Sequence, residues 1–381
     1  MPRNSYVAII GAGCVGLSTA YHLAKMGVKD IVVLEQGYLG SGATARCAGG
    51  IRQQWTTTPN ILLAKESVEM FSNFEEELGQ DIEFTQGGYL LPAYDEITLD
   101  RYQKDIELQN KAGVQTRLID PHEVKEIAPL LDTSEMTGAC FGPGDGRANP
   151  FLVLEGYANC CRELGVKIHT NTRVVNLRSA GSGFEVTTEN SRFHASYVVN
   201  AAGGYARNIA NMLGIDINVK SFRHQIFITE PVKQALTPFV VDVNRNLYFS
   251  QCATGGFIAG HSDKHQLSDH DQRESWKSGV QIARKLIRAV PSLSKISVLR
   301  HWAGSYATSL DKQPILGPTL ENPSFMLACG FSGHGFMLSP IAGKLVAECI
   351  TKPNDLSLDI ESFLLERFEV HAHLVTEQNV V

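Results

Sequence analysis

Two short apolar runs and one stretch of helical spacing open the chain. Residues 6–10 and 31–34 are continuous apolar runs rich in β-branched types, which is typical of buried parallel strands. Between them, apolar residues recur at helical spacing from Leu17 to Ala24, and Gly27 then favours the end of a helix. This order predicts a strand–helix–strand unit at the start of an α/β domain.

The rest of the chain continues with helical and strand-like patterns. Helices are predicted over residues 61–79, 95–128 (with breaks near Gly113 and Pro121) and 151–164, strands over 166–169 and 197–204, and a hairpin near Gly181. Alternating apolar and polar residues over 216–300 predict strands of a sheet with one ligand-facing side. A last helix is predicted from Ser339, as N-cap, to Ile350, with Pro340 at its first position.

A glycine-rich turn joins the first predicted strand to the first helix. In it, Gly11 permits a tight turn, Gly13 lets the backbone approach a pyrophosphate, and Gly16 lets helix and strand pack closely. The helix then directs its positive end at the phosphates. Glu35 ends the second strand at about the offset of 20 residues expected for a carboxylate that binds free ribose hydroxyls. This unit serves NAD and FAD alike, so it predicts a dinucleotide and leaves its identity open.

A loop of small residues, GSGATARCAGGIRQQW over 40–55, favours FAD. Such a loop brings backbone close to an extended ligand; a flexible linker is the alternative, although Ile51 and Trp55 beside two arginines are unusual for one. With this loop the chain resembles the FAD-dependent amine and amino-acid oxidoreductases of the D-amino-acid-oxidase superfamily. Within it, the sequence is most similar to the β subunits of heterotetrameric sarcosine oxidase and of archaeal dye-linked L-proline dehydrogenase.

The resemblance covers essentially the whole chain and implies a mixed α/β fold of two domains. A Rossmann-type FAD domain, discontinuous in sequence, is expected to comprise residues 1–80, 140–215 and 300–381. An antiparallel-sheet substrate domain is expected to comprise residues 81–139 and 216–299.

The glycine motif and the resemblance together give a set of expected cofactor-binding residues. They are Gly11, Gly13, Cys14, Val15, Gly16, Glu35, Gln36, Ser41, Gly42, Ala43, Thr44, Arg46, Cys47, Ala48, Gly49, Gly50, Ile51, Val174, Ala201, Ala202, Gly203, Gly304, Gly330, Gly333, His334, Gly335, Phe336 and Met337. Gly304 stands where monomeric sarcosine oxidases carry a cysteine bonded to the flavin, so non-covalent FAD is expected. The resembled β subunits also make an FMN at a subunit interface a candidate.

Four residues are the candidates for substrate binding and catalysis. Arg52 is the expected carboxylate clamp, because a guanidinium fork binds two oxygens and the matching arginine of monomeric sarcosine oxidases does so; a surface ion pair is the alternative. Tyr248 and His261 match an aromatic residue and a histidine that line the substrate pocket of those oxidases. The alternatives are a tyrosine on an edge strand and a histidine without a role in the site. Met337 replaces a lysine that helps to bind carboxylate, which leaves more of the task to Arg52.

These observations predict an FAD-dependent amino-acid dehydrogenase. It would oxidise the C–N bond of a secondary amino acid, L-proline or sarcosine-like, by hydride transfer to the flavin. Phe257 stands where the resembled oxidases have a lysine that is credited with activating oxygen, so a non-oxygen acceptor is expected. The resemblance to the β subunits implies that this acceptor could be a partner flavoprotein or electron-transfer subunit. An oxygen-using oxidase and a flavin-holding, non-catalytic subunit remain alternatives, and an arginine clamp would also accept a hydroxy acid.

Composition limits the other classes of function. The 381 residues are 43% hydrophobic and 19% charged, which suits a folded soluble protein of two or three domains. The net charge of −6, with no stripe of Lys and Arg, argues against nucleic acid. The eight cysteines form no CxxC pair, so neither a metal site nor a disulfide framework is expected and the cytoplasm is the predicted compartment. Neither a leader before residue 6 nor a transmembrane segment is expected.

Overall fold

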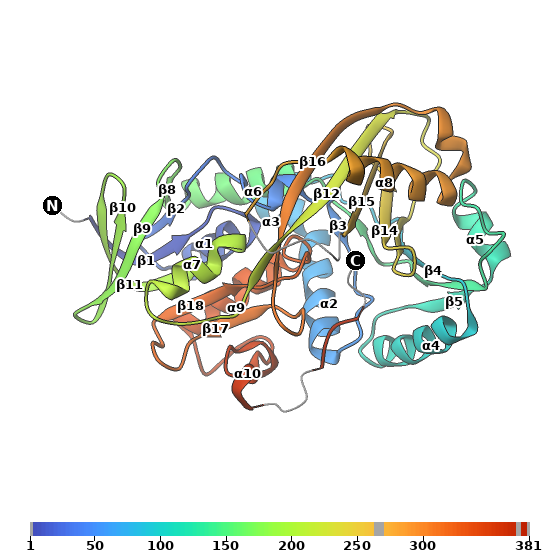
Figure 1. Cartoon of the computed structure of the whole chain (residues 1–381). Helices are drawn as coiled ribbons and strands as arrows, with labels where there is room; N and C mark the ends of the chain where they lie inside the picture. Colours follow the sequence, from blue (N-terminus) through green and yellow to red (C-terminus); the bar gives the residue numbers. More distant parts are fainter. Residues whose placement is uncertain (1–2, 263–269, 371–374, 379–381) are drawn as a thin grey trace.

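Two large β-sheets lie side by side along the molecule, and helices pack around them (Figure 1). This computed structural model describes residues 3–262, 270–370 and 375–378. The two sheets are called sheet A and sheet C, and the short pair β3 (Gly50–Ile51) and β7 (Gly146–Arg147) lies apart from both.

Sheet A contains the predicted parallel strands. Its order is β17-β18-β11-β1-β2-β8, with β10 and β9 attached as a hairpin to β11, and β1 pairs in parallel with both β2 and β11. Its strands are β1 (Arg3–Ile10), β2 (Ile31–Leu34), β8 (Lys167–His169), β9 (Val174–Ala180), β10 (Gly183–Thr188), β11 (Arg192–Asn200), β17 (Ile315–Pro318) and β18 (Phe325–Cys329). This order confirms the Rossmann-type prediction.

Helices cover both faces of sheet A because alternate residues of β1 point to opposite sides. Val7 and Ile9 pack into a cluster with α1 (Cys14–Lys25), α2 (Thr58–Ser72), α6 (Pro150–Glu163) and α9 (Ser339–Thr351). Ala8 and Ile10 pack into a second cluster with α7 (Ala206–Asn211) and the β9–β10 hairpin. The carboxyl ends of the parallel strands therefore stay open to a ligand.

Two glycines of the motif have the packing roles that the sequence indicated. Gly11 has φ +110°, and a Cβ there would lie 2.4 Å from the backbone oxygen of Ala201. A Cβ on Gly16 would lie 2.1 Å from the backbone oxygen of Gly11. The first turn of α1 can therefore sit against β1 and β11 only if both positions are glycine.

Sheet C is mainly antiparallel and has the order β16-β12-β15-β14-β13-β4-β6-β5. Its strands are β4 (Tyr89–Ala93), β5 (Arg117–Ile119), β6 (Gly138–Gly142), β12 (Lys220–Pro231), β13 (Phe239–Asp242), β14 (Leu247–Gln251), β15 (Gly256–Ser262) and β16 (Val298–Thr308). The remaining helices are α3 (Phe74–Leu78), α4 (Glu96–Lys111), α5 (Pro121–Ile127), α8 (Trp276–Ala289) and α10 (Arg367–Val370).

The two faces of sheet C have different neighbours. Phe249 and Phe257 point to α8 and form a core with Ile282 and Leu286. Tyr248, on the opposite face of β14, belongs to a separate cluster with residues of β4 and β13. The alternating pattern over 216–300 thus corresponds to the two faces of sheet C, one packed on α8 and the other facing away from it. Helix α8 itself interrupts the pattern.

Three details differ from the sequence predictions. Helix α9 has Leu338 as its N-cap, and the Ser339 hydroxyl donates to the Phe336 backbone oxygen at 2.8 Å, so the prediction of a Ser339 cap is wrong. Residues 95–128 include strand β5 between two helices. β16 pairs with β12 along its length, so residues up to Thr308 lie in sheet C, while the division into two domains stays a prediction.

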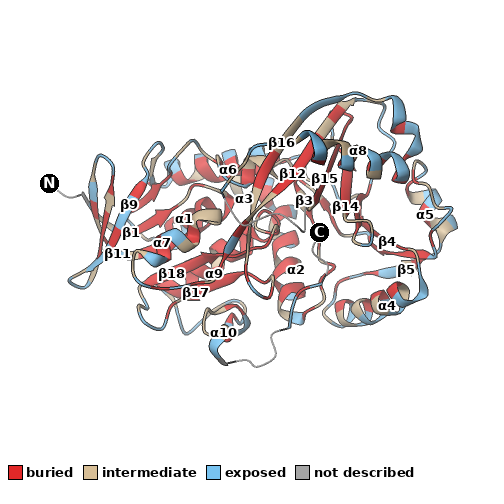
Figure 2. Ribbon diagram, viewed as in Figure 1, coloured by how far each residue is buried: buried red, intermediate tan, exposed pale blue. Residues whose placement is uncertain are grey.

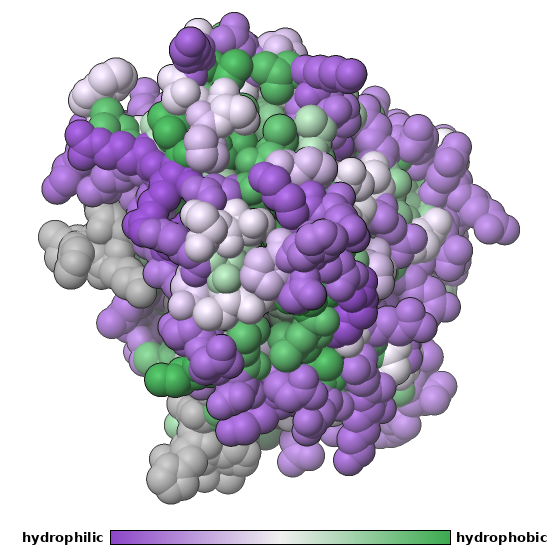
Figure 3. Space-filling model, turned by 90° about the vertical axis from the view of Figure 1, so that its right-hand side faces the viewer, coloured by the Kyte–Doolittle hydropathy of each residue, from purple (hydrophilic) through white to green (hydrophobic). Residues whose placement is uncertain are grey.

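Burial follows the two sheets, whose strands are largely buried while the exposed residues lie on helices, hairpin tips and loops (Figure 2). The face of the molecule around α4, α5 and α8 is mostly hydrophilic, with hydrophobic residues gathered in small patches (Figure 3). Among the described residues, no helix has the length and apolar character needed to cross a membrane.

Candidate active site

Two adjoining cavities lie where the strand ends of sheet A meet sheet C. The larger has a volume of about 440 Å³ and the smaller about 80 Å³. Their linings share Cys47, Tyr248, Tyr306, Gly333 and Phe336, so these residues form the boundary between the two spaces.

The larger cavity is lined by most of the residues expected to bind the cofactor. They are Gly11, Gly13, Cys14, Val15, Glu35, Gln36, Ser41, Gly42, Ala43, Thr44, Arg46, Cys47, Ala201, Ala202, Gly203, Gly304, Gly330, Gly333, Gly335 and Phe336. Gly16 supports this lining from behind through its contact with Gly11.

Glu35 organises the end of the larger cavity at β2. Its Oε2 accepts the Ala12 backbone N–H at 2.9 Å, and its Oε1 accepts the Gly37 N–H at 2.8 Å and the Ser41 hydroxyl at 3.0 Å. Each carboxylate oxygen can accept more than one hydrogen bond, so Glu35 retains capacity for ribose hydroxyls.

The 40–47 loop is fastened to the start of α1. The Cys14 backbone N–H donates to Thr44 Oγ1 at 3.1 Å. The Arg46 guanidinium folds back on its own loop, where Nη1 donates to the backbone oxygens of Ser41 and, at 2.8 Å, of Gly42. Arg46 therefore shapes the loop.

The donor and acceptor groups of the larger cavity fit a dinucleotide such as FAD. The N-terminal end of the 12-residue helix α1 faces the cavity and supplies positive potential for phosphates. At Gly13 a Cβ would lie 3.1 Å from Thr44 Oγ1, so a side chain there would press on the residue that fastens the 40–47 loop to α1. Glu35 supplies the ribose acceptor at the β2 end.

The smaller cavity is aromatic and contains a buried cation. Tyr89, Phe239, Tyr248 and Tyr306 line it together with Arg52. Apolar walls with one cationic side chain suit a small ligand that carries a carboxylate.

Arg52 is only 4% exposed, so it is not a surface residue. Its Cζ lies 4.0 Å from the ring centroid of Trp55, whose indole N–H donates to the Arg52 backbone oxygen at 3.2 Å. Burial lowers the pKa of Arg52, while electrostatic interactions with Tyr89, Glu377 and Asp145 act to raise it. The guanidinium is thus placed where a carboxylate ligand would find little competing water.

Tyr248 is paired with a histidine that the sequence interpretation missed. The Tyr248 hydroxyl lies 2.9 Å from His224 Nε2, and His224 Nδ1 lies 3.1 Å from the Ser262 hydroxyl. Burial lowers the pKa of His224 to about 3 and raises that of Tyr248 well above its ordinary value. Both groups are therefore neutral near pH 7. The His224 ring also stacks on Tyr306, with centroids 4.1 Å apart.

Glycines make room for the tyrosine hydroxyls of the smaller cavity. A Cβ at Gly260 would lie 2.3 Å from the Tyr248 Oη, and one at Gly50 would lie 1.9 Å from the Tyr89 Oη. Because β15 lies between β12 and β14, the missing side chain of Gly260 is what lets His224 and Tyr248 meet across it.

Five residues expected at the cofactor line the smaller cavity instead of the larger one. They are Ala48, Gly49, Gly50, His334 and Met337. His334 packs edge-on against Trp55, with ring centroids 4.2 Å apart, and burial first and then the Arg52 charge lower its pKa well below the ordinary value. A neutral imidazole beside Arg52 leaves the guanidinium as the main positive charge of this cavity.

Some expected site residues are placed elsewhere. Of the described residues, neither cavity lining includes Ile51, Val174 or His261. His261 lies on the α8 side of β15, where its Nε2 is 2.8 Å from the Ser278 hydroxyl and its Nδ1 is 3.2 Å from Lys285 Nζ. The strand pleat turns it away from Tyr248, so His261 lies outside both cavities, against the prediction.

Phe257 also points to the α8 side of β15 and away from the cavities, because it lies on the same face of the strand as His261. It is fully buried between sheet C and α8, two pleats before His261 on the same face of β15. The structure therefore corrects the interpretation that Phe257 takes the place of a ring-facing lysine.

Sequence reasoning missed His224 and Tyr89 as lining residues. His224 precedes the continuous apolar run 226–228, which gives no clean alternation, and Tyr89 begins the run 89–93. Only the pairing register of β12, β15 and β14 reveals that His224 faces Tyr248. Such register comes from long-range pairing and leaves no local signal.

Comparison with known proteins places this geometry among flavoenzymes. The profile of the DAO FAD-dependent oxidoreductases matches residues 6–349. The chain is 29% identical to sarcosine oxidase subunit beta of Rhodobacter capsulatus, over 92% of this chain and 86% of that one. It is 28% identical to human mitochondrial dimethylglycine dehydrogenase, over 90% of this chain but 42% of the longer human protein.

A solved structure shows the same similarity in three dimensions. The crystal structure of L-proline dehydrogenase from P. horikoshii superimposes with a TM-score of 0.92 at 36% sequence identity, covering 97% of this chain and 99% of that one.

Proposed function

The chain belongs to the DAO family of FAD-dependent oxidoreductases, and on that premise we propose that it oxidises the C–N bond of a secondary amino acid, L-proline or sarcosine-like. The observation that carries the proposal is the buried Arg52 in a small aromatic cavity that adjoins the larger, dinucleotide-sized one. The names of the relatives, sarcosine oxidase and L-proline dehydrogenase, support this substrate class.

FAD, when bound, supplies the hydride acceptor. The residues that would hold it are those of the glycine turn and the 40–47 loop, with Glu35 at the ribose. We propose a non-covalent attachment, because Gly304 lines the larger cavity where related oxidases carry the bonded cysteine.

Arg52 would bind the substrate carboxylate and so orient the carbon that loses hydride. A buried guanidinium can hold both oxygens and fix the rotation of the substrate. Met337, which lines the same cavity, adds an apolar surface and no second charge.

Tyr248 and His224 would receive the substrate nitrogen. If His224 Nδ1–H donates to Ser262, Nε2 accepts the Tyr248 hydroxyl proton, and the Tyr248 oxygen then faces the ligand as an acceptor. Because His224 is held neutral, the pair would place an acceptor oxygen and no positive charge beside the substrate nitrogen, which would orient that nitrogen and the adjacent carbon.

The electrons would pass to an acceptor other than oxygen. Among the described residues that line the two cavities, the permanent cations are Arg46 and Arg52, and no lysine is present to stabilise a superoxide-like charge. The Rhodobacter relative is named as one subunit, and we propose that this chain also delivers electrons to a partner flavoprotein, with an FMN at the interface as one route.

Anaerobic mixing with L-proline and with sarcosine tests the proposal. One of them should bleach the flavin absorbance almost completely, and Arg52→Ala should raise its KM by about 10²–10³-fold, since a buried ion pair loses one partner. FAD content should not change in this variant. Absence of bleaching with any amino acid would refute the proposal, and rapid peroxide formation in air would favour the oxidase instead.

A further inference from the structure

The carboxylate of Glu377 is buried next to the turn that carries Arg52. Glu377 is 0% exposed. Its Oε1 and Oε2 accept the Thr56 backbone N–H at 3.3 and 3.1 Å, and Oε1 also accepts the Thr56 hydroxyl at 2.9 Å. The Asn60 amide donates to Oε2 at 3.3 Å. Glu377 thus binds the residue that follows Trp55 and the first turn of α2.

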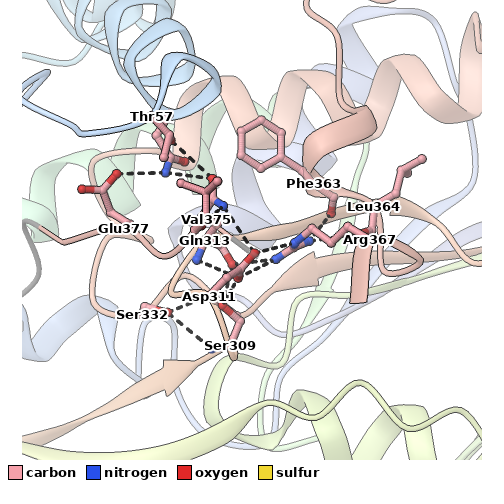
Figure 4. Close-up of polar contacts among 12 residues, drawn as sticks. Thr57, Ser309, Asp311, Gln313, Ser332, Phe363, Leu364, Arg367, Val375 and Glu377 are labelled. Atoms are coloured by element: carbon pink, nitrogen blue, oxygen red, sulfur yellow. Dashed lines mark hydrogen bonds and ion pairs between the residues drawn. The ribbon is translucent and has the colours of Figure 1, made fainter. Parts of the chain in front are cut away.

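The segment that carries Glu377 is anchored to a buried ionic cluster (Figure 4). The Glu377 backbone N–H donates to the Asp311 backbone oxygen at 3.0 Å, and the Gln313 amide donates to the Val375 oxygen at 3.0 Å. Asp311 in turn accepts two hydrogen bonds from Arg367, at 2.8 and 3.0 Å. These contacts with Asp311 and Gln313 hold the carboxylate of Glu377 in place beside Thr56. Both residues lie 250 and more positions after Thr56 in the sequence.

The position of Thr56 determines that of Arg52 through Trp55. The Trp55 indole N–H donates to the Arg52 backbone oxygen, and its ring lies under the guanidinium at 4.0 Å. On the other side of the turn, Asp145 Oδ1 accepts the Gln53 backbone N–H at 2.9 Å. The Arg52–Trp55 turn is thus held at both ends by buried carboxylates.

We propose that Glu377 is a positioning residue for Arg52, one that aims the guanidinium at the substrate carboxylate from outside the two cavities. The inference rests on the proposed function of Arg52 and deepens it. The negative charge of Glu377 also stabilises the N-terminal end of α2. The same charge favours the protonated form of the Arg52 guanidinium.

The expected consequence is a change in KM with little change in kcat. Arg52 would hold the substrate carboxylate equally in the ground state and the transition state, so loosening it weakens uniform binding. Glu377→Ala should raise the KM for the reactive amino acid about tenfold, as expected for loss of hydrogen bonds to a charged group. Glu377→Gln keeps one acceptor oxygen and should have a smaller effect.

Matched controls come from the same segment. Thr376 and Gln378 flank Glu377 with exposed side chains, so Thr376→Ala and Gln378→Ala should match the parent protein. In an Arg52→Ala background, Glu377→Ala should have no further effect on KM, because its action passes through Arg52. A KM effect that persists undiminished in that background would overturn the proposal.

Hydrogen exchange measured without substrate separates this inference from the proposed function. Glu377→Ala should speed exchange in peptides that cover Arg52 to Asn60, and the two control variants should not. Unchanged exchange there would overturn the positioning role. Faster exchange in a protein that no amino acid reduces would show that Glu377 holds the Arg52 turn, whereas the proposed function, and with it the aim at a substrate carboxylate, would fail.

Discussion

The two cavities are built in different ways, although they share a wall. One end of the larger is lined by two short segments, 10–15 and 34–47, which the strand–helix–strand unit brings together by itself; the rest comes from later parts of the chain, such as 201–209 and 328–336. The smaller takes its lining from six separated parts of the chain, including Tyr89, Val241, Tyr248 and Tyr306. The strand–helix–strand end of the first site therefore depends on local backbone geometry, and the second site depends on the register of distant strands.

A change in the glycine turn should have the largest effect, and it should act on the cofactor side alone. Gly11→Val adds side-chain atoms where even a Cβ would lie 2.4 Å from the Ala201 oxygen, at a φ of +110°. Strain and overpacking together should cost about 2–5 kcal/mol, and bound FAD should be lost. The ratio of flavin to protein absorbance measures this loss.

Gly144→Ala is the control for this experiment, since Gly144 lines neither cavity and a Cβ there would lie 3.4 Å from its nearest atom, Gln53 Nε2. It should change the free energy of unfolding by less than about 0.5 kcal/mol. A Gly11→Val protein that retains a full complement of FAD would contradict the local origin of this end of the larger cavity.

This contrast explains how much could be predicted from the sequence. The glycine motif, Glu35 and the loop around Arg52 are runs of neighbouring residues whose spacing has a direct structural meaning. The structure places most of them at the two cavities, while their binding roles stay predictions. Tyr248 was found through resemblance, whereas His224 was missed and His261 was assigned to the wrong face. A shift of one residue along a strand reverses its facing, and no short pattern in the sequence specifies the pairing of β12 with β15.

The two faces of sheet C provide a sharper test, with an intermediate effect. Tyr248→Phe removes the hydroxyl that lies 2.9 Å from His224 and should lower kcat by about 10²-fold, because the substrate nitrogen loses the acceptor that orients it. His261→Gln, on the α8 face of the same sheet, should leave kcat within about twofold. Stopped-flow measurement of flavin reduction distinguishes the two variants. Equal losses in both would show that the register argument fails.

The smallest effect is expected from Asp145, which supports the turn of Arg52 without lining either cavity. Burial raises the pKa of this carboxyl to about 7, against hydrogen bonds from Gln53 and the charge of Arg52 that lower it. Of the partners in the described chain, none bonds its Oδ2, so the neutral form suits the folded state better than the charged form.

The sign of the pH dependence follows from this pKa. Between about pH 4 and pH 7 the folded protein holds a proton on Asp145 that the unfolded chain, with an ordinary pKa of about 3.9, has released. Stability from this group is therefore fully present below about pH 4 and is lost progressively as the pH rises from there through 7. Asp145→Asn should flatten this part of a plot of Tm against pH, while Glu321→Gln, at an exposed acid, should not.

Because Asp145 holds the Gln53 N–H beside Arg52, the same variant should also reduce any change of substrate KM between pH 6 and 8, roughly the range of its titration. An unchanged slope in both plots would mean that Asp145 is already charged in the folded protein, and that the turn it supports is coupled to the substrate side by its hydrogen bonds alone.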